Sequence, residues 1–332
     1  MSRAKRERGR TWLVRASTRA FYREGKRVEG YSVLDWLHGY VYARWPYLYI
    51  GVGTGEHPLS RLLAPVVGLF SRLFWSDAPE GAGEAGAGVA FADSYHGKVM
   101  PVESAKRLVS VGHAIELRDL EQVIPYSQAR DIVLQDPDHI VVLDCPCRSA
   151  RTNPCLPLDV CLIVGEPFAS FVAEHHASRS RWITQQEAVE IIEAEHERGH
   201  VQHAFFKDAM LGRYYAICNC CSCCCGAMQA WSGDTPMLAS SGYVSQVEPT
   251  LCRGCGDCAQ ACPFDAISIR GERSVVDADA CMGCGVCVDR CEQGALSLVR
   301  DPSKGEPLEI AELLEAAARG QDSPEPATSS VR

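Results

Sequence analysis

Cysteine is absent from the first 144 residues of this 332-residue chain, and all eighteen cysteines lie between Cys145 and Cys291. Long apolar runs are also scarce: the longest uncharged one near the N-terminus, 62–71, is far shorter than the roughly 20 residues that cross a bilayer. The first thirty residues hold ten Arg or Lys and no apolar segment of a secretory signal. A secreted disulfide framework is therefore excluded, and we expect a cytoplasmic chain whose clustered cysteines bind metal.

Two further observations narrow the function. Residues 31–332 carry 23 basic and 39 acidic side chains, a net charge near −16 that should repel nucleic acid. Gly51-x-Gly53-x-Gly55 resembles a phosphate loop only superficially, because neither a strand–helix unit nor Lys-Ser/Thr follows it, and no dinucleotide fingerprint occurs elsewhere. We therefore expect neither a nucleic-acid partner nor a flavin or nicotinamide bound by the chain itself.

Composition and periodicity divide the chain into five regions. They are a basic arm with an aromatic helical region (1–77), a Gly/Ala-rich linker (78–90), a cysteine-rich α/β domain (91–242), a tandem cysteine repeat (243–300), and a short helix with a disordered tail (301–332). Apolar spacing, caps and β-branched runs predict helices at 34–45, 59–75, 184–199 and 308–319, and strands at 139–143 and 213–217. Both strands lead directly into cysteines, so we expect them to deliver thiols to one shared site.

The strongest pattern is an internal repeat with an offset of 29 residues. Four cysteines spaced x2, x2 and x3 occur twice, at Cys252, Cys255, Cys258 and Cys262 and at Cys281, Cys284, Cys287 and Cys291. Three thiolates with two residues between each pair can surround one face of a [4Fe–4S] cube, provided that the chain turns tightly. Glycine permits such turns, and it occupies Gly254, Gly256, Gly283 and Gly285. A zinc ribbon also uses Cys-x2-Cys pairs, but two tandem runs of four favour iron–sulfur ligation.

This repeat resembles the two-cluster bacterial ferredoxins over about 50 of the 332 residues. In that family the fourth cysteine of each run binds the other cluster. The resemblance implies two [4Fe–4S] clusters, one held by Cys252, Cys255, Cys258 and Cys291 and the other by Cys281, Cys284, Cys287 and Cys262. Pro263 follows the first run as in the family, whereas Glu292 stands at the equivalent place in the second. That departure bears on the potential of the cluster that Cys291 serves rather than on its binding.

Ten more cysteines lie upstream of the repeat. They are Cys145, Cys147, Cys155, Cys161, Cys218, Cys220, Cys221, Cys223, Cys224 and Cys225. Buried free cysteines usually occur singly, so six within eight residues indicate metal ligation, for one or two further iron–sulfur clusters. Thiol redox chemistry without metal and plain packing are the alternatives. Adjacent cysteines in an extended backbone point to opposite sides, so Cys220 and Cys221 should not serve the same cube.

The stretch 217–226, ICNCCSCCCG, is similar to one found in cysteine-rich bacterial iron–sulfur proteins that are named for their ferredoxin domain. That resemblance implies no activity beyond the ferredoxin domain. Cys224-Cys225-Gly226 also resembles half of the paired Cys-Cys-Gly motif of heterodisulfide reductases, although a second copy is missing.

These patterns together predict an α+β protein, with a C-terminal two-cluster ferredoxin-like module joined to a mixed α/β cysteine-rich domain. We expect it to relay single electrons between a redox partner protein and the upstream metal site. The alternative is an iron–sulfur oxidoreductase that acts on a substrate, such as a thiol or disulfide, at the upstream cysteines. Such an enzyme needs a proton donor or a non-cysteine ligand there. Five histidines fit that role or that of exposed helix and loop residues: His175, His176, His196, His200 and His203.

The basic arm and the aromatic residues that follow it, up to Trp75, have three interpretations. They dock a partner subunit, lie at an anionic membrane surface, or pack on their own domain. Arg and Lys beside Trp and Tyr suit a lipid interface. The apolar segments lack one clean amphipathic face, however, so the sequence favours partner docking over the membrane.

Overall fold

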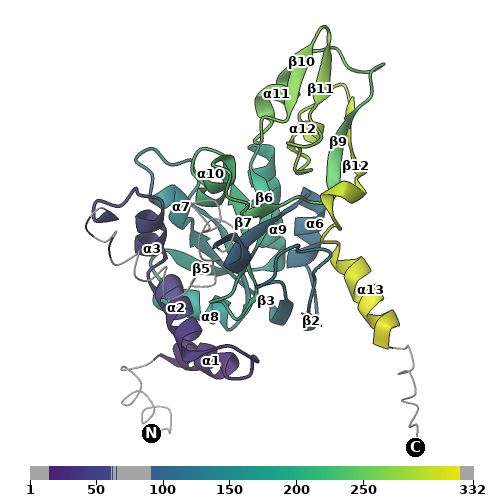
Figure 1. The fold of residues 1–332 in the computed structure, drawn as a ribbon. Helices are drawn as coiled ribbons and strands as arrows, with labels where there is room; N and C mark the ends of the chain where they lie inside the picture. The colour runs from purple at the N-terminus through teal and green to yellow at the C-terminus, as the bar shows by residue number, and fades with distance from the viewer. Residues whose placement is uncertain (1–14, 61, 63–64, 66–90, 322–332) are drawn as a thin grey trace, which may run out of the picture.

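A large β-sheet forms the centre of the computed structural model, which describes residues 15–60, 62, 65 and 91–321 (Figure 1). Within these residues the strands follow the order β2-β3-β4-β7-β6-β1-β8, and β5 also pairs with β3. Neighbouring strands are antiparallel except β1 and β8. The strands are β1 (Tyr95–Met100), β2 (Ile115–Leu117), β3 (Ile132–Asp144), β4 (Asp159–Glu166), β5 (Ser180–Ile183), β6 (Val201–Lys207), β7 (Arg213–Cys220) and β8 (Leu238–Ala239).

Helices cover both faces of this sheet, because its strands alternate between two hydrophobic cores. On β3, Ile140 and Val142 enter the core shared with α6 and α9, whereas Val141 and Leu143 enter the core shared with α8 and the N-terminal helices. A strand that is buried on both faces needs a continuous apolar run, which residues 140–143 supply. The helices are α1 (Ala16–Gly25), α2 (Val33–Arg44), α3 (Pro46–Gly53), α6 (Val102–Val109), α7 (Pro146–Ser149), α8 (Phe168–His175), α9 (Gln185–Glu197) and α10 (Gly226–Ser232).

Local sequence determines where several elements begin and end. α9 starts after Thr184, whose hydroxyl accepts a hydrogen bond of 3.1 Å from the amide of Glu187. α2 stops just before Pro46, which lacks an amide hydrogen and begins α3 instead. The helices expected at 34–45, 184–199 and 308–319 and both expected strands are confirmed. Most of the helix expected at 59–75 lies outside the described residues, as do the linker 78–90, the first part of the arm (1–14) and the end of the tail (322–332).

The N-terminal helices α1 to α3 belong to the core of the cysteine-rich domain. Phe21 of α1 packs edge-on against Phe168 and Phe171 of α8, at ring distances of 5.6 and 5.9 Å. Gly39 lets α2 approach closely, since a β-carbon there would lie 2.0 Å from the carbonyl oxygen of Ala209. Of the three interpretations of this region, packing on its own domain therefore describes α1 to α3. In the described part of the chain no helix has the length and apolar character to cross a membrane.

Residues 243–300 form a small module at one end of the molecule, at the top of Figure 1. Its two hairpin-like pairs, β9–β12 and β10–β11, flank two short helices whose N-caps are left-handed glycines, as the tight turns require. At Gly254 and Gly283 a β-carbon would lie 2.5 Å or less from a backbone oxygen, so only glycine fits. The elements are β9 (Tyr243–Val247), α11 (Asp257–Ala261), β10 (Ile267–Arg270), β11 (Arg273–Val276), α12 (Val286–Asp289) and β12 (Leu296–Arg300), followed by η3 (Pro302–Lys304) and α13 (Ile310–Gln321).

The module is attached to the larger domain by specific contacts. The ring of Phe264 packs edge-on against Trp231 of α10 at 5.2 Å. Ser241 donates from its hydroxyl to the carbonyl oxygen of Gly283 at 2.8 Å, and His196 of α9 bonds the carboxylate of Asp289 at 2.6 Å. These contacts place one half of the module against α9 and α10.

Candidate metal centres

The eight cysteines of the repeat lie around two separate cavities of similar size. One, of about 310 Å³, is lined by the outer set, which we define as Cys252, Cys255, Cys258 and Cys291. The other, of about 320 Å³, is lined by the inner set, which we define as Cys262, Cys281, Cys284 and Cys287. Each cavity thus receives three thiols from one run and one from the other. This exchange arises because α11 and α12 pack against each other, which brings the end of each run beside the start of its partner.

Backbone amides and two serines point at the sulfur atoms with the same symmetry. The amides of Ala266 and Ala295 donate to Cys262 and Cys291, both at 3.3 Å. The backbone amides of Ser245 and Ser274 also donate, to the sulfur of Cys281 at 3.5 Å and to that of Cys252 at 3.4 Å. The Ser274 amide contributes most to lowering the pKa of Cys252. Such donors stabilise thiolates and tune the potential of a bound cluster.

Our sequence reasoning missed these serines, although the signal was available. Ser245 and Ser274 are 29 residues apart, the same offset as the cysteines. Their hydroxyls also contact the matching cysteines, Cys287 at 3.4 Å and Cys258 at 3.1 Å. Extending the repeat backwards by seven residues would have identified them.

The two sets differ in their distance from solvent. The outer set contains Cys255, which is exposed, whereas three of the four inner cysteines are buried. Burial accordingly raises the pKa of Cys287 to about 11. Cys284 and Cys262 pack in the same hydrophobic core as Met228 and Trp231 of α10. The inner set therefore faces the cysteine-rich domain, and the outer set faces water.

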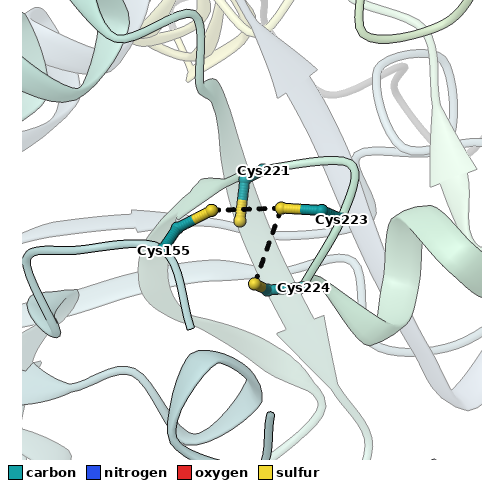
Figure 2. Close-up of side chains that lie close together, drawn as sticks. All are labelled: Cys155, Cys221, Cys223 and Cys224. Atoms are coloured by element: carbon teal, nitrogen blue, oxygen red, sulfur yellow. Dashed lines mark hydrogen bonds between the residues drawn. The ribbon is translucent and has the colours of Figure 1, made fainter. Parts of the chain in front are cut away.

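The ten upstream cysteines separate into two groups. The buried set lines a cavity of about 850 Å³ and consists of Cys145, Cys147, Cys161, Cys218, Cys220 and Cys225. Figure 2 shows the edge set, whose sulfur atoms point toward one another and which consists of Cys155, Cys221, Cys223 and Cys224. Cys220 and Cys221 fall into different groups, as the alternation of an extended backbone predicts. Cys221 also borders the large cavity, so the two groups are neighbours.

The buried set forms where three strands meet at one end of the sheet. β3 ends at Asp144 just before Cys145, and Cys161 of β4 lies directly opposite Cys218 of β7, with their sulfurs 3.6 Å apart. The sulfurs of Cys220 and Cys225 are 3.2 Å apart. Hydrogen bonding from neighbouring thiols and burial together raise the pKa of Cys145 and Cys161. The same kind of hydrogen bond lowers the pKa of Cys218 and Cys225. Burial disfavours each thiolate, so a cation must compensate for them if several ionise.

Arg148 is a buried cation beside these thiols, and no sequence pattern pointed to its role. Its side chain is 1% exposed and lines the large cavity. The guanidinium pairs with Glu195 of α9 and donates to the carbonyl oxygens of Asn219 at 3.0 Å and Pro157 at 2.6 Å. It therefore joins the loop after β3 to α9 and to the end of β7.

Tyrosine hydroxyls complete the wall of the cavity. Tyr42 lies 2.7 Å from Tyr215 and 3.5 Å from Tyr95, measured between hydroxyl oxygens. Burial raises the pKa of all three, so they remain protonated. Behind them the ammonium of Lys207 lies 4.6 Å from the Tyr95 ring centre, and burial lowers its pKa to about 8. Sequence reasoning missed the grouping of the three tyrosines, because they come from separate segments. For residues 205–208 it left open whether they position a substrate or only form a helix, and Lys207 lies on strand β6.

The five histidines lie outside the wall of the large cavity formed by the described residues, and one of them, His203 of β6, is paired directly opposite Cys218 of β7. They are mostly buried rather than exposed: His176 bonds the carbonyl oxygen of Ala43, and His196 bonds Asp289. His200 approaches the cysteines only through Arg148, at 3.0 Å. Among the described residues, the hydroxyl groups on the cavity wall belong to tyrosines.

Comparison with known proteins supports the interpretation of the repeat. Residues 251–300 match the family model of the 4Fe-4S dicluster domain. The match contains all eight cysteines of the outer and inner sets, so the chain carries a ferredoxin-type domain for two [4Fe–4S] clusters. A search of the curated proteins finds no match to the chain. The domain supports an iron–sulfur electron-transfer role, and the cysteine-rich region is interpreted from its geometry.

Proposed function

We propose that this protein relays single electrons between a redox partner, which meets the outer set, and an additional iron–sulfur centre in the buried set. The outer set would hold one [4Fe–4S] cluster and the inner set the other. A bound cluster of this kind stores and releases one electron. The outer set lies nearest the solvent, the inner set faces the cysteine-rich domain, and the buried set lies inside that domain.

The observation that carries this proposal is the position of α10. This helix begins at Gly226, directly after Cys225 of the buried set, and it presents Trp231 to Phe264 beside the inner cavity. A short, packed helix therefore connects the inner set with the buried set. The outer set, with its exposed Cys255, is the natural entry from a partner protein.

Iron and sulfide counting in anaerobically reconstituted full-length protein tests the additional centre. Two ferredoxin clusters account for about eight irons per chain, so we expect more than eight. The double variant Cys161→Ala/Cys218→Ala should return the count to about eight while the ferredoxin signals persist. A count of about eight in both proteins would contradict the proposal.

The tyrosines favour a second candidate function, an iron–sulfur oxidoreductase whose substrate enters the large cavity. Reducing a disulfide to two thiols requires two electrons and two protons. The ferredoxin domain would supply the electrons one at a time. The two protons would come from water, and the hydroxyls of Tyr42, Tyr95 and Tyr215 beside the buried thiols would relay them.

Oxidation of a reduced viologen in the presence of small disulfides separates the two functions. Substrate-dependent oxidation that Tyr95→Phe slows without loss of iron supports the enzyme. Oxidation that depends only on an added redox protein supports the carrier.

A further inference from the structure

We propose that the edge set binds one tetrahedral metal ion of the zinc class, as a site separate from every iron–sulfur cluster. The site goes beyond electron transfer, and it does not depend on the function proposed above. It consists of Cys155 from the loop before β4 and three cysteines from the turn between β7 and α10, Cys221, Cys223 and Cys224 (Figure 2).

The spacing of the sulfur atoms carries this proposal. All four lie within 4.8 Å of one another, with 3.0 Å between Cys155 and Cys223 and 3.6 Å between Cys223 and Cys224. A tetrahedral ion with Zn–S bonds of about 2.3 Å places its ligands about 3.8 Å apart. In a [4Fe–4S] cube each thiolate binds a different iron, which separates the sulfur atoms further.

The ferredoxin cysteines provide an internal comparison for this spacing. Among the described residues, the edge set is the group in which three or more candidate ligand atoms all lie within 4.8 Å of one another. The outer and inner sets, which belong to a two-cluster iron–sulfur domain, do not form such a group. Nor do the cysteines of the buried set.

The surroundings suit a closed structural site. Cys221 and Cys224 have the Cys-x2-Cys spacing that is typical of zinc ligands, and both are buried. The guanidinium of Arg151 donates to the carbonyl oxygen of Cys224 at 3.1 Å, next to what would be four thiolates around a divalent ion. Gln229 of α10 donates to the carbonyl oxygen of Cys223 at 3.0 Å and holds the turn.

An ion here would fix the geometry of the neighbouring buried set. The turn that carries three of its ligands also carries Cys220 and Cys225 at its two ends. Cys155 lies in the loop that joins Cys147 to Cys161. A four-thiolate site would therefore clamp both cysteine-bearing segments together, and metal binding would stabilise the fold.

Metal analysis of two matched variants of the full-length protein tests the site. Cys223 and Cys255 are the two exposed cysteines, so replacing either one disturbs the packing least. With zinc and iron supplied, we expect about one zinc per chain in the wild type. Cys223→Ser should lower it at least tenfold and leave the iron of the two ferredoxin clusters, about eight per chain, in place. Cys255→Ser should do the reverse, losing iron while keeping zinc.

Cobalt provides a second readout that does not rely on zinc content. Co²⁺ added to protein stripped of zinc should give the intense absorption of a tetrahedral thiolate complex, and Cys223→Ser should abolish it. Loss of iron instead of zinc in Cys223→Ser would assign the edge set to a cluster and overturn the proposal. A disulfide between Cys155 and Cys223 in protein that binds neither metal would also overturn it.

Discussion

Single cysteines in this protein differ mainly in what lies within reach of their sulfur atoms. Cys252 receives a backbone amide, Cys161 faces another thiol, and Cys223 lies beside three sulfurs at the surface. The same side chain can therefore bind an iron cube, contribute to a buried thiol cavity, or bind a single ion. Sulfur spacing and donor geometry decide between these roles.

The crossing of ligands between the two ferredoxin runs gives a prediction at this scale. Cys262 lines the inner cavity with Cys281, Cys284 and Cys287, although its sequence neighbours line the outer one. Cys262→Ser should therefore damage the inner cluster. Paramagnetic resonance of the reduced variant, together with iron counting, should show the loss of one cluster signal and about four irons.

Double variants identify which cluster is lost. Adding Cys262→Ser to Cys284→Ser should remove no further iron, because both residues would serve the inner cluster. Adding it to Cys255→Ser should remove the iron of both clusters. The opposite pattern would show that each run keeps its own four ligands.

At the scale of elements, the buried thiols depend on how α7, α9 and β7 are held together. Arg148 of α7 lies between them, with Glu195 of α9 as its ionic partner and the Asn219 carbonyl of β7 as its acceptor. Burial raises the pKa of Glu195, but hydrogen bonds from His200 and Arg148 outweigh it, so the net shift is downward. The carboxylate is thus ionised where it is 1% exposed.

Removing Arg148 should therefore destabilise the protein strongly. Breaking a buried ion pair costs about 3–5 kcal/mol, and Arg148→Met should fall near the lower end because His200 and Arg198 still contact Glu195. Denaturant unfolding of anaerobic protein measures the change. Arg198→Met is the matched control, since this half-exposed arginine pairs with the same carboxylate and should cost less than about 1 kcal/mol.

The double variant Arg148→Met/Glu195→Met should recover part of the lost stability, because it removes the unpaired charge. Equal losses for Arg148→Met and Arg198→Met would show that the buried pair has no special role.

The whole molecule has charges of opposite sign in different parts of the chain. Residues 1–14 carry five basic side chains and one acidic one, whereas residues 243–300 carry eight acidic and five basic ones. Long-range fields of this kind can steer two different encounters. The sequence predicts that the basic arm docks a partner, here an acidic one. α1, which begins at Ala16, packs one face on the core through Phe21, while its basic residues Arg19 and Arg23 stay exposed.

Deleting residues 1–14 tests the arm without removing α1. Reduction by an acidic redox protein should slow roughly tenfold at low ionic strength, and the difference should shrink in salt as the Debye length falls. Reduction by a small neutral mediator is the control and should not change, nor should the iron content. Equal rates for the truncated and intact proteins at low and high salt would exclude electrostatic docking by residues 1–14.

The spacing of the ferredoxin cysteines could be predicted from the sequence, because it depends on residues that are close together in the chain. Each ferredoxin run keeps three cysteines within seven residues, and the glycines at 254 and 283 allow the turns that bring them together. The main helices and strands were readable for the same reason, since caps, prolines and apolar periods act over a few residues. By itself the sequence thus determined a two-cluster module joined to a second cysteine-rich domain.

Only the tertiary structure decided how the other ten thiols divide. Cys145, Cys161 and Cys218 meet because β3, β4 and β7 pair side by side, and sheet pairing between distant segments leaves no mark in local spacing. The same pairing brings Tyr215 to Tyr42 of α2 and assembles the hydroxyl wall. Cys220 then points into the buried set and Cys221 into the edge set, because successive side chains of an extended strand point to opposite sides.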